Sequence, residues 1–303
     1  MNARFFLMGA IVAGLCATPV LAQQGPNKPF GWSIAGGGFY QSDTDLKDSP
    51  GSFSVSRGFL ELGARRSWGP RRSVGISLGA GITDYSFDNA TGLSSGDPWS
   101  TIEDYSVSVP IRFPVSQRAN AILVPNVRWE AEQDADLGDG DSYGGFAGVA
   151  WRVNEGLTIG PGLGVFSRLE GGADFFPILI IDWSITDRLS LSTGGGLGAS
   201  RGPGLTLTYQ ATKDWSLGIA ARYEDNEFRL DDKGVAPDGI GRDRVTPVIA
   251  TVGWEPNPAM SFSVFAGVEL GGKLSLMDED GNTIQSSDYD PAPIFGGAFR
   301  FRF

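Results

Sequence analysis

Charged side chains that alternate with apolar ones are the residues best placed for chemistry in this sequence of 303 residues. In 215–224, for example, Leu217 and Ile219 alternate with Arg222 and Glu224. A period of two puts these two kinds of side chain on opposite faces of a strand. Inside a closed barrel, a ring of such charges sets the solute preference of a pore. The same charges can instead neutralise one another as ion pairs that fill and stiffen the barrel.

The alternation marks a set of candidate pore-lining residues, and both roles remain open for them. Each candidate is a charged residue on the polar face of a strand-like segment. The candidates are Arg57, Glu61, Arg112, Arg128, Glu130, Arg152, Arg168, Asp182, Arg188, Arg222, Glu224, Glu269, Arg300 and Arg302.

Catalytic and metal chemistry have little support in the sequence. There is no histidine, and the single cysteine, Cys16, lies in the expected signal peptide, so neither a Ser–His nor a Cys–His arrangement is possible in the mature chain. The acidic stretches 134–141 and 278–282 lack the spacing of a calcium loop. We expect them to be solvated loop tips that can share divalent ions with lipopolysaccharide phosphates. We therefore expect no enzyme, no cofactor and no dedicated metal site.

Strand-like segments must position these side chains. No segment beyond the N-terminus has the roughly 20 apolar residues of a spanning helix, which leaves a barrel for a membrane protein. A soluble β-sandwich also alternates, but aromatic residues bound the apolar faces here, as in Trp215/Tyr223 and Tyr105/Phe113. About fourteen strands are expected, at 30–40, 52–65, 73–87, 102–114, 119–132, 142–153, 156–168, 174–185, 188–199, 204–211, 215–229, 244–255, 259–275 and 292–303.

The connections predict an antiparallel up-and-down barrel with both termini in the periplasm. Long connections rich in Asp, Gly and Ser alternate with tight turns such as 154–155 and 256–258. The connections 169–173 and 200–203 are short for extracellular loops, so twelve strands are the alternative. Prolines inside the strands predict bulges. A further bulge is expected near Arg57–Gly58, where the apolar side of 52–65 changes face.

The N-terminus predicts export. Arg4 precedes an apolar run, 5–17, and Val20 and Ala22 suit a signal peptide that covers 1–22 and is removed after Ala22. The expected barrel is then 23–303, and its polar lead, 23–29, is too short for a plug domain. A net charge of −11 with no basic stripe argues against nucleic acid as a partner.

The last strand carries a family resemblance. Phe295, Gly297, Phe299, Phe301 and Phe303 share one face, while Arg300 and Arg302 share the other. A terminal aromatic strand of this kind resembles the closing strand of Gram-negative outer-membrane β-barrels. Within that class the chain is similar to medium-sized barrels of uncharacterised function and, more distantly, to the phenol-degradation (MetA-pathway) type.

The resemblance implies an outer-membrane location and an assembly signal. The barrel assembly machinery would read Phe299, Phe301 and Phe303, and the other implied partners are outer-membrane lipid and lipopolysaccharide. It implies no catalytic residues.

A barrel of this size lies between the eight strands that side chains fill and the sixteen that leave a wide channel. We therefore expect a monomeric, narrow, passive channel for small polar or anionic solutes. The alternative is a sealed structural or scaffold barrel that displays acidic loops or docks periplasmic partners. Arg65, Arg66, Arg71 and Arg72, at the first periplasmic turn, would suit such docking.

Overall fold

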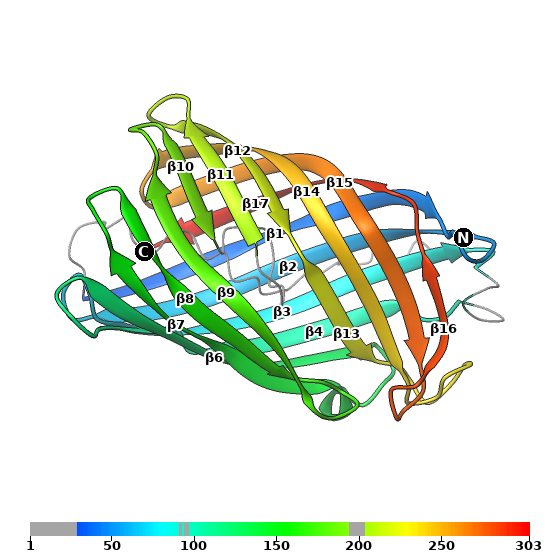
Figure 1. Cartoon of the computed structure of the whole chain (residues 1–303). Coiled ribbons are helices and arrows are strands. Elements are labelled where there is room, and N and C mark those ends of the chain that lie inside the picture. Colours follow the sequence, from blue (N-terminus) through cyan, green and yellow to red (C-terminus); the bar gives the residue numbers. More distant parts are fainter. Residues whose placement is uncertain (1–28, 91–92, 94–96, 194–203) are drawn as a thin grey trace, which may run out of the picture.

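A closed antiparallel barrel makes up the described part of the chain, which in the computed structural model comprises residues 29–90, 93, 97–193 and 204–303. One sheet holds seventeen strand segments, and three crossings consist of two segments each, so the barrel has fourteen strands (Figure 1). This confirms the expected fold and the count of fourteen over twelve. The expected signal peptide, 1–22, lies outside the described residues. Within them, no helix is long and apolar enough to cross a membrane.

The segments follow one another around the barrel. Those that share a crossing are β4 with β5, β12 with β13, and β16 with β17. The strands are β1 (Phe30–Asp45), β2 (Ser52–Ser67), β3 (Ser73–Asp88), β4 (Thr101–Ser108), β5 (Ile111–Pro114), β6 (Ala119–Glu132), β7 (Asp141–Arg152), β8 (Leu157–Ser167), β9 (Ala173–Ser184), β10 (Leu189–Thr193), β11 (Gly204–Gln210), β12 (Trp215–Arg222), β13 (Glu224–Arg229), β14 (Ile240–Asn257), β15 (Met260–Met277), β16 (Thr283–Asp288) and β17 (Ala292–Arg302), and a short 3₁₀ helix, η1 (Leu137–Gly140), precedes β7.

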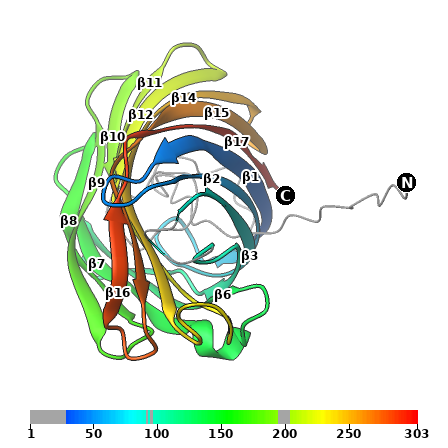
Figure 2. The same cartoon turned by 90° about the vertical axis from the view of Figure 1, so that its right-hand side faces the viewer.

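The first and last strands close the ring. β1 pairs with β2 on one side and with β17 on the other, and Figure 2 shows the strands encircling the lumen end on. The pairing continues to the last residue, because the Phe303 amide donates to the Trp32 carbonyl at 2.8 Å. We call the end with the tight connections, such as 68–72 and 258–259, the turn end, and the other the loop end.

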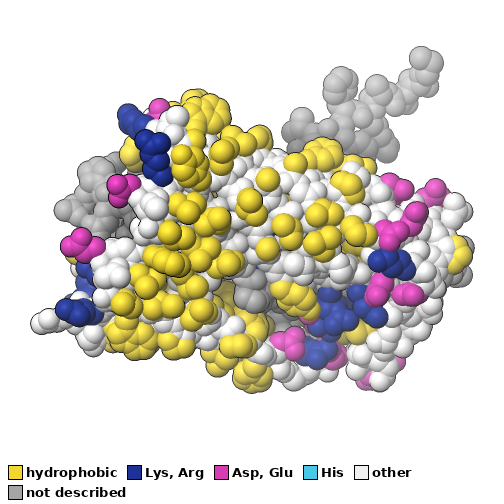
Figure 3. Space-filling model, turned by 45° about the horizontal axis from the view of Figure 1, so that its top comes forward, with side chains coloured by type: hydrophobic (Ala, Val, Ile, Leu, Met, Phe, Trp, Pro, Cys, Tyr) yellow, Lys and Arg dark blue, Asp and Glu magenta, His cyan; other side chains and the backbone are white. Residues whose placement is uncertain are grey.

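The outer face carries an apolar band between two aromatic rims. Leu62, Leu163 and Val264 are among its exposed side chains, and Figure 3 shows apolar side chains gathered along the wall. Aromatic girdles of this kind sit at the two interfaces of a membrane. Exposed tryptophans mark the turn end. They are Trp32, Trp151, Trp183, Trp215 and Trp254 on the strands and Trp68 in the β2–β3 turn, while Tyr40, Tyr143, Phe175, Tyr223 and Phe295 lie toward the loop end. The chain thus has a porin-like outer-membrane barrel fold.

Prolines disturb the strands less than expected. Pro110 does separate β4 from β5, and a register shift between Arg244 and Thr246 lies close to Pro247. The β8–β9 register, however, runs unbroken through Pro161 and Pro177. The bulge predicted at Arg57–Gly58 is absent, because both registers of β2 are continuous there.

A reversal of polarity explains β2 without that bulge. Phe53, Val55 and Arg57 all face the lumen, and Phe53 and Val55 are buried. Beyond the apolar band the outer face meets water, so polar residues such as Asp84 and Ser86 are exposed there. The inner face of the same extension is apolar and packs inside the barrel. The strand therefore keeps its period of two while its apolar side changes from outer to inner.

The barrel narrows toward the loop end. β6 extends past the start of β7, and its residue Ala131 forms a parallel bridge with Arg229 of β13. At the loop end, β6 is therefore a direct neighbour of β13, and the strands from β7 to β12 do not take part in the ring. The ring at this end consists of β1–β4, β6 and β13–β16. Fewer strands enclose a narrower space that side chains can fill.

Candidate functional site

An ion-paired belt crosses the inner wall where the barrel begins to narrow. Glu224 accepts from Arg222 at 2.5 Å and lies 3.7 Å from Arg57. Arg128 pairs with Glu130 at 2.6 Å, and both side chains are buried. Buried side chains keep their charge only when they are paired. In the belt each arginine lies beside a carboxylate, so the ion pairs largely cancel its net charge.

Further acids of the belt were not among the sequence candidates. Asp243 is buried and accepts from the Tyr85 hydroxyl at 3.0 Å and the Tyr289 hydroxyl at 3.2 Å. Asp104 lies directly opposite Glu130 on the inner face. Asp243 fell in the predicted loop 230–243, whereas β14 begins at Ile240. The alternation of Gly241 and Asp243 with Arg242 and Arg244 was the signal that could have placed it.

A packed aromatic cluster fills the lumen beyond the belt. We call it the loop-end cluster; it comprises Leu46, Phe53, Val55, Tyr85, Ala90, Leu93, Trp99, Ile102, Phe228, Leu230, Ala236, Val245, Leu274, Leu276 and Tyr289. Trp99, from the β3–β4 connection, meets the Tyr85 ring edge-on at 5.8 Å and the Phe228 ring at 5.3 Å. Phe53 and Tyr289 stack edge-to-face at 4.9 Å. These rings close the loop end of the lumen with a hydrophobic core.

Two glycines make room for these rings. A Cβ atom at Gly272 would overlap the ring of Tyr289, and one at Gly241 would overlap the ring of Phe228. Each glycine lets a strand pass directly against an aromatic side chain. The close packing of the cluster therefore depends on backbone positions without side chains as well as on the rings themselves.

The turn-end half of the lumen has a different lining, which we call the vestibule. Arg300 and Arg302 of β17, Arg65 of β2 and Arg112 of β5 lie on the inner face, as their cross-strand partners Ala35, Ser33, Gly75 and Ser73 show. Their side chains are exposed or partly exposed, unlike the buried belt. The same half holds Glu61, Asp182 and Glu255, which accepts from Ser261 beside Arg300, with Arg152 and Arg188 at its turn-end rim. Among the described residues, arginines therefore outnumber acids in the vestibule.

The other candidates lie as follows. Glu269 is buried on the inner face close to the loop-end cluster. Arg168 lies outside the belt, at the β8–β9 hairpin, where it pairs with Glu170 and approaches Glu227 of β13 at 3.9 Å. It links the hairpin to the narrowed ring. The structure thus brings Arg57, Arg128, Glu130, Arg222 and Glu224 into the belt and separates Arg168 from them.

Four arginines, Arg65, Arg66, Arg71 and Arg72, were expected to suit docking at the β2–β3 turn, but Arg71 holds two turns of the barrel together. Arg71 donates to the carbonyls of Ser116, Gln117 and Ala119 and to Oδ1 of Asn120. These contacts tie the β2–β3 turn to the β5–β6 turn. Arg66 lies over the Trp68 ring at 5.1 Å, while Arg65 faces the vestibule. The four arginines therefore do not form one outward-facing docking patch.

The outward phenylalanines of β17 line its lipid side. Phe301 packs edge-on against Phe262 at 5.7 Å and lies 5.5 Å from Phe299. Phe303 is 62% exposed at the very end of the strand. These are the positions of the expected assembly signal.

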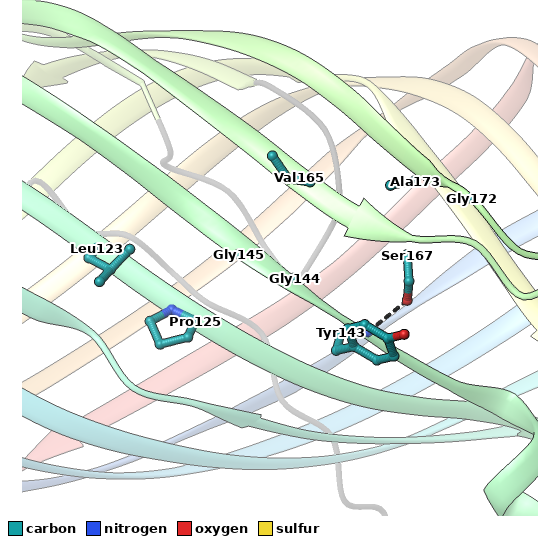
Figure 4. Close-up of a pocket in the computed structure, with 9 residues that line it drawn as sticks. All are labelled: Leu123, Pro125, Tyr143, Gly144, Gly145, Val165, Ser167, Gly172 and Ala173. Carbon is teal, nitrogen blue, oxygen red and sulfur yellow. Dashed lines mark hydrogen bonds between the residues drawn. The ribbon is translucent and has the colours of Figure 1, made fainter.

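A shallow groove also crosses the outer wall near the loop end (Figure 4). It has a volume of about 390 Å³ and runs between Leu123, Tyr143 and Val165 over the bare backbone of Gly144 and Gly145. The Tyr143 amide donates to Ser167 Oγ at 2.9 Å at its edge. Its lining faces away from the lumen, so it takes no part in a pore.

The acidic residues of the loops have other contacts in the structure. Among the described residues, no group of three potential metal ligands is found. In 278–282, the Asp278 carboxylate accepts hydrogen bonds from the Asn282 side chain at 3.0 Å and from the Asn282 backbone N–H at 2.7 Å. These bonds lower the pKa of the exposed Asp278 carboxyl. The carboxylate shapes its own loop.

Comparisons with known proteins give similarity to solved barrels alone. No protein-family description and no curated protein match the chain. An outer-membrane channel from Pseudomonas putida F1 is 12% identical, covers 93% of this chain and 100% of its own, and has a TM-score of 0.49. The toluene transporter TodX of P. putida is 8% identical over 96% of each chain, with a TM-score of 0.47. The KdgM porin is 9% identical over 89% of this chain and 99% of its own, with a TM-score of 0.37. Similarity at this level does not extend to a solute.

Proposed function

We propose that the protein is a passive outer-membrane channel for small polar solutes, with a preference for anions. The apolar band between two aromatic rims supports a membrane location. The vestibule is the observation that carries the proposal. Its arginines are accessible to water, and glycine and serine on the neighbouring strands leave space between them. A water-accessible lining with excess positive charge attracts anions.

The loop-end cluster defines the resting state of this channel. Its rings are packed and buried, so a solute that enters the vestibule meets a hydrophobic barrier beyond the belt. Conduction then requires rearrangement of the cluster. Trp99 is the side chain best placed to move, since it comes from the connection between β3 and β4 rather than from a strand.

Single-channel recording in a planar bilayer tests the proposal. Wild type should conduct in brief openings, and Trp99→Ala should raise the open fraction because it removes the largest connection-borne ring of the cluster. Arg300→Gln with Arg302→Gln should lower the anion preference measured from the reversal potential. Trp68→Ala, which removes an exposed tryptophan at the turn end, is the matched control. Absence of conductance in both wild type and Trp99→Ala, each folded, would refute the channel.

The second candidate is a sealed barrel, and the loop-end cluster is the observation that favours it. A lumen closed by fully buried side chains such as Phe53 and Leu274 has the character of a structural core. The same recording decides between the two functions, because a sealed barrel stays silent when Trp99 is truncated.

The export, membrane insertion and lipid contacts of the barrel are also inferred. We infer a signal peptide at 1–22, insertion by the barrel assembly machinery through Phe299, Phe301 and Phe303, contact with outer-membrane lipid and lipopolysaccharide, and a monomer. The exposed terminal phenylalanine and its pairing with β1 support the inferred signal.

A further inference from the structure

Two cations lie directly opposite each other on the outer face of the loop end. Arg244 of β14 is the cross-strand partner of Lys273 of β15. Asp225 of β13 and Asp288 of β16 flank them in the same row. Like charges directly opposite in a sheet are destabilising. The row therefore runs acid, base, base, acid, with its two positive charges at the centre.

The flanking acids neutralise this centre only in part. Asp225 accepts from Arg242 Nε at 2.7 Å and Nη2 at 2.6 Å, so its two oxygens are engaged by the next arginine along β14. Asp288 lies 3.6 Å from Lys273. The backbone of Arg244 pairs with those of Asp225 and Lys273, but among the described residues its side chain makes no hydrogen bond or ion pair. In the described part of the chain, Arg244 has no acidic partner and Lys273 has only a weak one. An excess of positive charge therefore remains between β14 and β15.

The pair sits at the border of the apolar band. Leu270, which is 40% exposed, and Thr246 follow directly on the turn-end side of the pair. Tyr223 is exposed beside it, with its hydroxyl donating to Asp225 at 3.3 Å. Figure 3 shows Lys and Arg side chains, with Asp and Glu side chains among them, at the edge of the apolar surface. A tyrosine rim marks the headgroup level of a bilayer.

We propose that Arg244 and Lys273 bind the phosphate of a membrane-lipid headgroup in the leaflet on the loop side. A guanidinium presents a planar fork of donors to phosphate oxygens, and an ammonium adds a point charge. The apolar band begins directly on the turn-end side of the pair and would contact the acyl chains of the same lipid. The phosphate of that lipid would then lie level with Arg244 and Lys273. This favours a lipid over a free anion. The inference rests on the proposed function only for the membrane location of the barrel.

The test is thermal unfolding of the purified, folded barrel in neutral detergent. Three additives are compared: phosphatidic acid, diacylglycerol with the same chains, and inorganic phosphate. Phosphatidic acid should raise the unfolding temperature of wild type above the effect of either other additive. Arg244→Gln with Lys273→Gln should lose most of this rise. Arg72→Gln with Lys213→Gln, which removes the same charge from exposed turn-end positions, should keep it.

Each result is decisive. An equal rise in the Arg244/Lys273 variant and in wild type would overturn the site. An equal rise with inorganic phosphate would show a free-anion site, and an equal rise with diacylglycerol would show that the phosphate is not recognised; either outcome overturns the proposal. If the double variant folds poorly, each single variant is measured instead and should lose part of the rise. Because the readout needs no conductance, a barrel that never conducts would still report on this site.

Discussion

At the scale of residues, the belt shows what alternation can and cannot reveal. Arg128 and Glu224 were found because each stands on the polar face of a regular strand. Asp243 was missed because it lies among charged neighbours beyond the apolar band, where the pattern resembles a loop. Its role is also not local: its partners, Tyr85 and Tyr289, come from β3 and from the residue after β16. A pattern along one strand cannot show contacts made across a lumen.

Replacement of Asp243 by leucine should destabilise the barrel. Two buried tyrosine hydroxyls would lose their acceptor, at a cost of about 1–3 kcal/mol for each. The measurement is the free energy of unfolding in urea, with the barrel in lipid vesicles. The exposed Asp280→Leu should change it little. Adding Tyr85→Phe and Tyr289→Phe to Asp243→Leu should recover much of the loss, since no orphaned hydroxyl remains. No recovery in this triple variant would contradict the hydrogen-bond explanation.

At the scale of elements, the fourteen crossings were predictable because lipid imposes one rule on all of them. Inside the apolar band every strand must be apolar outside, so period and polarity agree. Beyond the band that rule ends, and β2, β3, β14 and β15 continue with their polarity reversed. The loops expected at 41–51, 230–243 and 276–291 are therefore partly strand. The sequence pattern of the extensions cannot be interpreted without knowing where the membrane stops.

The closing strand, β17, carries the element-scale prediction. Phe303→Ser should slow appearance of the folded barrel in the outer membrane, because it removes the terminal aromatic side chain from the strand that completes the ring. The measurement is the folded fraction in a pulse-chase, read from heat-modifiable migration on a gel. Phe30→Ser removes an exposed aromatic from the partner strand at the same end and should assemble faster than Phe303→Ser. Equal, normal rates for both variants would show that Phe303 is no signal.

At the scale of the whole molecule, one chain combines two barrels of different size. Fourteen strands enclose the water-accessible vestibule, while the narrower ring at the loop end is filled like a small barrel. The bridge between β6 and β13 creates this difference. It could not be predicted from the sequence, because Ala131 and Arg229 are far apart along the chain and a single bridge leaves no periodic trace. The charged belt lies between the two regions.

This arrangement predicts a gradient of access along the lumen. Single cysteines are clean reporters, since Cys16 is the only native cysteine and lies in the expected signal peptide. A charged, water-soluble thiol reagent should label Arg300→Cys quickly and Arg222→Cys more slowly. It should label Arg128→Cys least of the three, because this side chain is 6% exposed within the belt. Val127→Cys, Leu217→Cys and Phe301→Cys should stay unlabelled in lipid.

The contrast between neighbouring positions is the internal control. A one-residue slip of register exchanges the two faces and would turn arginines toward the bilayer at a cost of about 2–4 kcal/mol each at the midplane. Labelling at 217 and 301 with protection at 300 would therefore refute the face assignment. Adding Trp99→Ala to Arg128→Cys should speed labelling if the loop-end cluster is what separates the belt from water on the loop side. An unchanged rate would place the barrier elsewhere in the narrowed ring.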